Sequence, residues 1–220
     1  MNRILHTQPV LSVIWGEKAI TNKFYKEQLM RERSKDLRVR RTINSIRRAF
    51  FELVLEKNYN EISITELTER AGINRKTFYL HFSSLDDFVA EIEEEIVSDI
   101  LDHIGKNAED FDLAGCITNF YLYLESCNEV QQKLLCDDHY SFFYESVTEG
   151  VLRSAPFVRF FEMTDYPSIV RSYTISITFI YRDWLKGGKK IPFEVLTAQT
   201  SKIIEKGYAG IVNKQDLIRG

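Results

Sequence analysis

Residues 63–82 read SITELTERAGINRKTFYLHF, and they are the most informative part of the chain. Ser63 and Glu66 form the capping-box pattern, in which the hydroxyl accepts a hydrogen bond at the helix start and the carboxylate reaches back to the cap residue. A short helix should therefore begin directly after Ser63. It should end before Gly72, because glycine adopts positive φ at a turn without steric cost. Asn74 can then cap a second helix. The stretch predicts a helix, a tight turn and a second helix.

The second helix combines an apolar face with a basic one. Ile73, Phe78 and Phe82 can face inward. The outward or edge positions are then Arg75, Lys76, Thr77, Tyr79 and His81. Cations, a hydroxyl and a phenol near the start of such a helix suit the phosphate oxygens and base edges of DNA. A surface hairpin with a solvated basic tip has the same pattern, but the agreement of length, turn and charge favours a DNA-binding helix-turn-helix.

Helical periodicity continues on both sides of this unit. Residues 37–57 carry one apolar stripe, formed by Val39, Ile43, Ile46, Phe50 and Leu53. After the unit, Ser84 can cap a long helix whose first turn holds Asp86 and Asp87, where the helix dipole favours acidic side chains. The stripe of that helix is formed by Phe88, Ile92, Ile96 and Ile100.

Charge divides the chain into two unlike parts. Residues 1–82 carry 16 Lys and Arg against 9 Asp and Glu, a net charge of +7. The remaining residues carry 13 against 23, a net charge of −10. An acidic part is repelled by a polyanion, so the whole chain is not expected to wrap DNA. A small DNA-binding head on a larger helical body is the economical division of 220 residues.

In these features the sequence resembles the TetR/AcrR family of bacterial transcription regulators. The similarity covers residues 38–91 and is most specific in AGINRKTFYLHFSS. Here the Thr-Phe-Tyr-x-His-Phe pattern typical of the family is matched by Thr77, Phe78, Tyr79, His81 and Phe82. The resemblance implies an all-α fold, in which a three-helix head is followed by a helical body for dimerisation and effector binding.

The resemblance also implies which residues contact the operator. They are Thr65, Arg75, Lys76, Thr77, Tyr79 and His81, with Tyr79 and His81 on phosphates and Arg75, Lys76 and Thr77 nearest the bases. We add Arg41, from the preceding helix, as a further DNA-binding candidate. Many relatives carry a phosphate-binding Lys near the start of the fourth helix, whereas this chain has Ser84 and Leu85 there. An amide at the helix start can substitute for that contact.

The division into domains follows from these patterns. We predict an N-terminal extension over residues 1–36, a helix-turn-helix domain over 37–83 and a helical body over 84–220. The body helices are expected at 112–127, 128–136, 141–154, 167–186 and 192–212, with loops at 106–110, 137–139, 155–156 and 187–192. Residues 173–181 alternate like a strand, but a helical step persists over a longer window and favours a helix.

A dimer is expected because each DNA-binding head recognises one half of a palindromic operator. Palindromic operators need two heads about one DNA turn apart, roughly 34–36 Å, so a protein with one head normally works as a two-fold dimer. In the family, the last two helices of each subunit pair in a four-helix bundle. The candidate interface residues are Ile177, Tyr181, Trp184, Ile203, Gly207, Gly210 and Ile211. The alternative is that they belong to the core of one subunit.

Aromatic residues in the body suggest a pocket for a small molecule. In the family, the helices after the head often enclose an effector whose binding changes the separation of the two heads. The candidate ligand-binding residues are Phe120, Tyr123, Phe143, Tyr144 and Tyr173. Aromatic walls with phenol tips suit a planar or amphipathic effector, although aromatic side chains at helical spacing also serve as ordinary core packing.

Neither a cofactor nor a metal is expected. Cys136, Asp137, Asp138 and His139 could join His103 or Cys127 around zinc, but contiguous ligands strain a tetrahedral site. No nucleophile with its base, Gly-rich phosphate loop or catalytic carboxylate pair stands out, so we expect no enzyme activity.

Cysteine usage and hydropathy bear on the compartment. Cys116, Cys127 and Cys136 have neither CxxC spacing nor an obvious pairing, and no signal peptide or membrane-spanning apolar run is apparent. These features predict a cytoplasmic protein with reduced thiols and no membrane partner.

Residues 1–36 lie outside the family pattern and have three interpretations. They form a basic arm that contacts phosphates or the minor groove, an extra helix packed by Trp15 and Phe24, or a segment upstream of the true start at Met30. We favour the arm.

As a whole, the sequence predicts a homodimeric repressor that an unidentified effector releases from a palindromic operator. The alternatives are control by a partner protein, and activation instead of repression.

Overall fold

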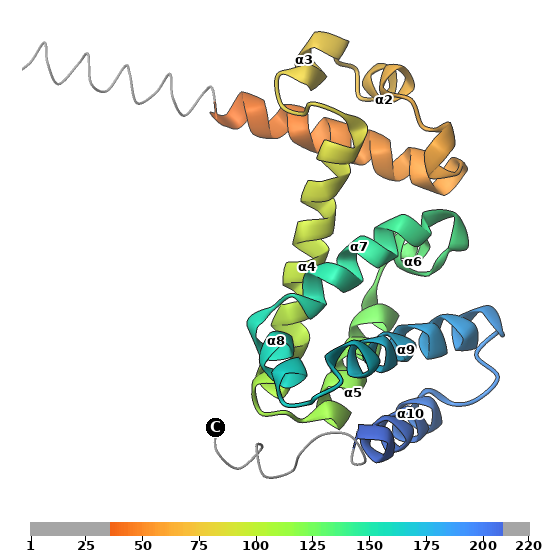
Figure 1. Ribbon diagram of the computed structural model, residues 1–220. Coiled ribbons are helices and arrows are strands. Elements are labelled where there is room, and N and C mark those ends of the chain that lie inside the picture. The colour runs from red at the N-terminus through yellow and green to blue at the C-terminus, as the bar shows by residue number, and fades with distance from the viewer. Residues whose placement is uncertain (1–35, 209–220) are drawn as a thin grey trace, which may run out of the picture.

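All of the regular structure in the described part of the chain is helical (Figure 1), as the sequence predicts. The computed structural model describes residues 36–208, except for the side chain of Tyr208. The N-terminal extension and the candidate interface residues Gly210 and Ile211 therefore lie outside the described residues.

The head is made of three helices and a short turn. A helix covers residues 36–56, the 3-10 turn η1 covers Tyr59–Glu61, and the short helices α2 (Ile64–Arg70) and α3 (Arg75–Tyr79) follow. Figure 1 shows α2 and α3 at one end of the molecule, alongside the helix of residues 36–56. The predicted helix, turn and helix are therefore present.

Aromatic rings form the core of the head. Phe78 is fully buried, and its ring centroid lies 5.5 Å from that of Phe82. Phe88 closes the cluster, with centroids 5.0 Å from Phe82 and 5.3 Å from Phe50. Edge-on and tilted pairs at these distances are favourable beyond the area they bury. Because Phe88 lies beyond the predicted domain boundary at residue 83, the start of the fourth helix belongs to the head core.

The helix α4 (Leu85–Glu109) links the head to the rest of the molecule (Figure 1). It begins with Ser84, whose hydroxyl accepts a hydrogen bond from the Asp87 amide at 3.0 Å. Its buried side chains recur at every fourth position, as Phe88, Ile92, Ile96, Ile100 and Ile104. This row faces the head core at one end and the body at the other, so one continuous apolar stripe joins the two cores.

The body packs six helices and a turn around the second half of α4. They are α5 (Leu113–Ser126), α6 (Glu129–Cys136), η2 (Asp138–Tyr140), α7 (Ser141–Leu152), α8 (Ala155–Glu162), α9 (Pro167–Lys186) and α10 (Phe193–Tyr208). α5 and α7 pack along α4, and α10 packs on α5 and α9. None of the described helices is long and apolar enough to span a membrane.

Two predicted loops are wrong, and each has a physical explanation. Residues 106–109 continue α4, because Ile104 and Ala108 remain on the buried stripe. Residues 155–156 begin α8, with Pro156 in its first turn. Proline is well tolerated there, because the first amides of a helix have no partner within the helix. The predicted helix at 141–154 consequently ends at Leu152.

The segment with alternating residues is helical, as predicted. α9 runs over Pro167–Lys186, and the loop at 187–192 follows it. The hydroxyls of Ser176 and Thr178 donate to carbonyl oxygens one turn earlier, at Tyr173 and Ile175, with distances of 2.5 and 2.6 Å. These bonds satisfy polar side chains inside a helix that would otherwise resemble a strand in composition.

Candidate DNA-binding surface and body cavity

The start of α2 is capped as predicted, but only in part. The Ser63 hydroxyl accepts a hydrogen bond from the Glu66 amide at 3.2 Å. The Glu66 carboxylate does not reach back to Ser63. It accepts a hydrogen bond from Lys57 Nζ at 2.7 Å instead. The predicted capping box is therefore half formed, because a nearby ammonium is a stronger partner for a carboxylate than a backbone amide is.

The turn and the second helix form as the sequence predicts. Gly72 has a φ of +67°, in the left-handed region that favours glycine. The Asn74 side chain accepts a hydrogen bond from the Lys76 amide at 2.8 Å and caps α3. Phe78 is fully buried. This burial fixes the orientation of the whole five-residue helix.

The DNA-binding candidates lie on the outer side of this unit. Arg75, Lys76, Thr65 and Arg41 are exposed, as is nearly half of Tyr79, while Thr77 and His81 are half-buried. The structure brings six of the seven candidates together on α2, α3 and the residues directly after α3, whereas Arg41 is on the helix of residues 36–56.

The cations of the head differ in whether they have acidic partners. Arg47 pairs with Glu95, Lys57 with Glu66, and Arg70 with Glu56. Two further arginines pair within their own helix, Arg40 with Asp36 and Arg48 with Glu52.

Arg75, Lys76, Arg41 and Arg38 have no acidic partner among residues 36–208. A cation without an internal partner can pair with a phosphate without breaking an existing bond. Three of these four are predicted DNA-binding residues, and the sequence analysis does not single out Arg38. Only its lack of a partner distinguishes Arg38 from Arg40.

Leu80 is another exposed residue of the head that the sequence analysis does not single out. It caps the end of α3 and is 79% exposed, an unusually open position for a leucine. The signal was available, because Leu80 follows Phe78 by two positions and so points away from the side that Phe78 buries.

The start of α4 does not favour phosphate binding by backbone amides. The Asp87 amide is occupied by Ser84, and the Ser83 amide donates to the Asp87 carboxylate at 2.7 Å. The hydrogen bonds from the Ser83 amide and then from the Ser83 hydroxyl lower the pKa of Asp87. Two carboxylates in the first turn, from Asp86 and Asp87, would repel a phosphate. The expected substitute for the missing lysine is therefore not supported by the structure.

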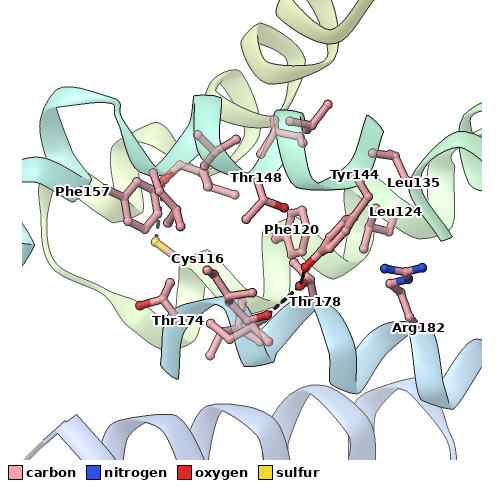
Figure 2. A pocket seen from close by; sticks show the side chains of 18 of the residues that line it. Cys116, Phe120, Leu124, Leu135, Tyr144, Thr148, Phe157, Thr174, Thr178 and Arg182 are labelled. Carbon is pink, nitrogen blue, oxygen red and sulfur yellow. Dashed lines mark hydrogen bonds between the residues drawn. The ribbon is translucent and has the colours of Figure 1, made fainter. Parts of the chain in front are cut away.

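A cavity lies inside the body, between α4, α5, α6, α7, α8 and α9 (Figure 2). Its volume is about 90 Å³. Its walls are almost entirely apolar, with Ile104, Ile117, Leu124, Val147 and Phe157 among them. The polar groups are hydroxyls and thiols, together with the guanidinium of Arg182.

The candidate ligand-binding residues divide between this cavity and the solid core. Phe120 and Tyr144 line the cavity, and the Tyr144 hydroxyl shares a hydrogen bond with Thr178 (Figure 2). Tyr123, Phe143 and Tyr173 do not line it. Phe143 is fully buried, Tyr123 packs against the His103 ring, and Tyr173 donates to the Ile203 carbonyl at 2.9 Å. The sequence could not separate these groups, because both have aromatic side chains at helical spacing.

The candidate interface residues are also placed differently from one another. Ile177 lines the cavity, and Tyr181 is fully buried and donates to Glu125 at 2.6 Å. Trp184 is 9% exposed and donates to the Ile191 carbonyl. These three side chains are part of the protomer's own interior, so the intramolecular alternative holds for them.

The two described candidates on α10 differ as well. Ile203 is 55% exposed and is available to a partner. Gly207 lies against the Tyr173 ring, where an added Cβ would be 2.4 Å from the phenol oxygen. Its small size therefore serves the packing of α9 on α10 within one chain.

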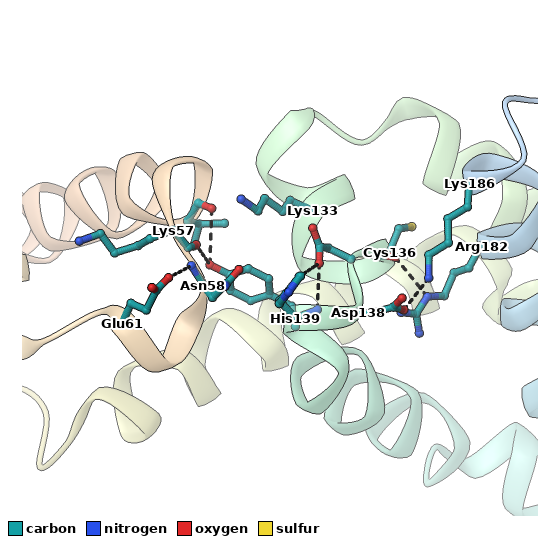
Figure 3. A network of polar contacts seen from close by, with 12 residues as sticks. Lys57, Asn58, Glu61, Lys133, Cys136, Asp138, His139, Arg182 and Lys186 are labelled. Carbon is teal, nitrogen blue, oxygen red and sulfur yellow. Dashed lines mark hydrogen bonds and ion pairs between the residues drawn. The ribbon is translucent and has the colours of Figure 1, made fainter.

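A junction of polar contacts joins body and head (Figure 3). Tyr140, in η2, is fully buried and its hydroxyl donates to the Lys57 carbonyl at 2.8 Å. Lys57 directly follows the helix of residues 36–56. Asp138, at the other end of η2, pairs with Arg182 at 3.0 Å and also with Lys186. One turn of three residues therefore contacts both the cavity wall and the head.

The residues weighed for a zinc site are occupied in other ways. Asp137 accepts hydrogen bonds from the backbone and ring of His139, and Asp138 pairs with cations. Burial raises the pKa of the Cys136 thiol to about 11. A thiol that stays protonated is a poor metal ligand. Within residues 36–208, no group of three or more His, Cys, Asp or Glu side chains is arranged to hold a metal.

Comparison with known proteins identifies the class of the head. Residues 46–92 match the sequence model of the bacterial regulatory proteins of the tetR family. Two regulators of Bacillus subtilis (strain 168) are similar to a part of the chain. YxbF, an HTH-type transcriptional regulator, is 31% identical over 75 residues, which are 34% of this chain and 20% of YxbF. YvdT, another such regulator, is 36% identical over 59 residues, or 27% of this chain and 30% of YvdT.

The fold of the whole described part has a relative among solved structures. The TetR transcriptional regulator from Streptococcus agalactiae 2603V superposes with a TM-score of 0.59 at 20% identity, covering 77% of this chain and 97% of that one. The head thus defines a helix-turn-helix protein. This chain is similar to the tetR family of bacterial regulatory proteins over residues 46–92, and its described part shares the fold of a TetR transcriptional regulator. It spans less than a third of the length of the two Bacillus relatives that it matches.

Proposed function

We propose that this chain is a sequence-specific DNA-binding transcriptional regulator, which binds a palindromic operator as a homodimer and represses until an effector occupies its body. The observation that carries the proposal is the pair of exposed cations at the start of α3, Arg75 and Lys76, which have no acidic partner among residues 36–208. We favour repression because blocking a promoter requires only that the site be occupied.

The contacts with DNA are assigned by chemistry and exposure. Arg75 and Lys76 approach the base edges from the start of α3, and Tyr79 and His81 contact phosphates near its end. Thr65, Thr77 and Arg41 complete the set, and Arg38 joins it because it too lacks an acidic partner in the described part of the chain. Leu80 is placed to contact a thymine methyl group through its exposed side chain.

The proposed dimer interface uses the exposed apolar side chains of α9 and α10. Ile203 and Phe179 are 55% and 56% exposed, and Val195 is 42% exposed. Large apolar side chains that a single chain leaves uncovered on its last two long helices are suited to burial against a second copy.

The cavity favours control by a small molecule over control by a partner protein. It is enclosed by helices on several sides, which suits a ligand of limited size. The contacts of η2 with Arg182 and with the Lys57 carbonyl give the head a physical link to the cavity wall. An effector that binds one arrangement of these helices better than another would shift the position of the head.

Selection from a randomised pool of DNA duplexes tests the DNA-binding proposal. We expect enrichment of a palindromic sequence, with an affinity that falls as salt rises, because cations that bind phosphates release counterions. Arg75→Ala should weaken binding to the enriched site by roughly 1–3 kcal/mol and relax its base preference. Arg153→Ala is the matched control, because it removes an exposed cation from the body. If no duplex is enriched, the proposal is wrong.

Sedimentation analysis tests the dimer. We expect the wild-type chain to sediment as a dimer and Ile203→Asp to sediment as a monomer, since an unpaired charge would be buried at the interface. Glu205→Asp is the control, as a conservative change at an exposed position on the same helix. A wild-type monomer at micromolar concentration would contradict this part of the proposal.

A further inference from the structure

Arg182 is an unusual residue for an apolar cavity. It is 6% exposed, yet it lies in the wall of a cavity whose other polar groups are uncharged at neutral pH. Burying a cation is costly unless its charge and its hydrogen-bonding groups are satisfied. The partners of Arg182 therefore decide what the cavity can accept.

Those partners leave the guanidinium only partly satisfied. Nη2 donates to Asp138 at 3.0 Å, and Nε donates to the Cys136 carbonyl at 3.4 Å. Nη1 makes no hydrogen bond with any residue in the described part of the chain. The carboxylate of Asp138 is also shared with Lys186, and its side chain is 72% exposed to water. Compensation for the buried charge is thus incomplete.

The position of the guanidinium is nevertheless well defined. Its central carbon lies 4.6 Å from the centroid of the Tyr144 ring and 6.0 Å from that of Phe179. Such cation–π contacts hold a guanidinium against an aromatic face while leaving its edge able to donate. Figure 2 shows Arg182 at one end of the cavity, with Cys116 and Phe157 at the other.

We propose that the cavity binds a small apolar molecule with one carboxylate, whose head pairs with Arg182 and whose body lies along the apolar wall toward Phe157. The inference rests on the proposed function, in which the cavity holds an effector, and it names the chemical class of that effector. A carboxylate accepts readily from an arginine edge in a site that excludes water. It would compete with Asp138 for the same guanidinium.

The size of the cavity sets the length of the apolar body. The cavity volume is about 90 Å³. One water molecule needs about 10–15 Å³ of such volume, so the cavity holds roughly six to nine groups of that size. A chain of about eight carbons therefore matches the space without large movement of the walls. Octanoate is the probe, and 1-octanol and octylammonium present the same chain with a neutral and a cationic head.

Calorimetric titration of the full chain without DNA tests the inference. We expect octanoate to bind at least about tenfold more tightly than 1-octanol, since a hydrogen bond to a charged group is worth about that factor. Octylammonium should not bind measurably, because its charge repels that of Arg182. Equal affinities for octanoate and 1-octanol, or no binding of octanoate, would overturn the proposal.

Two variants locate the head group. Arg182→Gln keeps a hydrogen-bond donor but removes the charge, and it should reduce octanoate affinity to that of 1-octanol. Asp138→Asn removes the competing carboxylate from an exposed position, and it should tighten octanoate binding severalfold while leaving 1-octanol binding unchanged. Asp183→Asn, at an exposed neighbouring position on α9, is the control and should alter neither.

Asp138→Asn keeps the test decisive if Arg182→Gln fails to fold, which circular dichroism would reveal. An Asp138→Asn protein that binds octanoate no better than the wild type would overturn the proposal. DNA selection on the same preparation separates this inference from the proposed function. A protein that selects a DNA sequence but does not bind octanoate contradicts the proposed ligand class alone. A protein that selects no DNA sequence contradicts the proposed function as a regulator.

Discussion

The head and the body place the cations to which we assign functions in opposite environments. In the head, Arg75 and Lys76 stand exposed on a short capped helix and have no acidic partner in the described part of the chain. In the body, Arg182 is buried in a long helix, packed on Tyr144 and paired with Asp138. An exposed cation suits a large polyanion that approaches from solvent, whereas a buried cation suits a small anion that enters a cavity.

The largest expected effect concerns how the exposed cations are held in place. Phe78→Ala should lower the free energy of unfolding of the head by about 3–5 kcal/mol, because it removes a fully buried ring from the aromatic core. Leu80→Ala, on the exposed end of the same helix, should change it by less than about 0.5 kcal/mol. Urea unfolding followed by circular dichroism measures both. Similar losses for the two variants would mean that the core does not anchor α3.

The two kinds of cation should differ in their contribution to stability. Arg182→Ala should lower the free energy of unfolding by about 1–3 kcal/mol, through lost packing on Tyr144 and lost hydrogen bonds. Arg75→Ala should change it by less than about 0.5 kcal/mol, since its side chain has no partner among residues 36–208 to lose. Thermal unfolding of both variants tests the contrast. A clear loss of stability in Arg75→Ala would contradict the expected difference between the two cations.

Two glycines extend the comparison to the backbone. Gly72→Ala should destabilise the head by about 1 kcal/mol, because its φ of +67° is unfavourable for any side chain. Gly105→Ala should stabilise the protein by about 0.5–1 kcal/mol, since this residue lies within α4 and an added Cβ meets nothing within 4 Å. Denaturant midpoints of the two variants should therefore shift in opposite directions.

The smallest effect is a dependence of head stability on pH. The pKa of Asp87 is lowered, first by the hydrogen bond from the Ser83 amide and then by that from the Ser83 hydroxyl. This carboxylate therefore contributes stability above its ordinary pKa, and the contribution is lost as pH falls below about 4. Asp87→Asn should flatten the decrease in stability at acid pH. Ser83→Ala should flatten it less, because the amide remains. Unchanged acid unfolding in Asp87→Asn would contradict the assignment.

Much of the fold could be predicted because its signals are local. The caps at Ser63, Asn74 and Ser84, the turn at Gly72 and the apolar stripe of α4 all form from neighbouring residues, and each is present. The errors lie where local signals are ambiguous. Pro156 begins α8 although proline also marks loops, and Glu66 bonds to Lys57 although Ser63 is nearer in sequence.

The candidate sites were less predictable, for a related reason. The exposure of the α3 residues follows from Phe78 facing inward, so periodicity predicts which side chains face outward, whereas their assignment to DNA contacts came from the family resemblance. Phe120 and Phe143 have the same chemistry, yet one lines the cavity and the other fills the core. Tyr181 and Ile203 are both apolar candidates on the last two helices, yet one is buried within the protomer.

The class of the head could be inferred from the amino-acid sequence, because a capped helix, a glycine turn and a basic aromatic helix are local features that need no distant partner. Three features could be seen only in the folded molecule: Arg182 lies at a cavity, Asp138 pairs with Arg182, and Tyr140 donates to the Lys57 carbonyl. The two pairwise contacts, of Arg182 with Asp138 and of Tyr140 with Lys57, each join residues more than forty positions apart. Such contacts depend on how the helices pack, and packing is set by the shapes of many side chains at once.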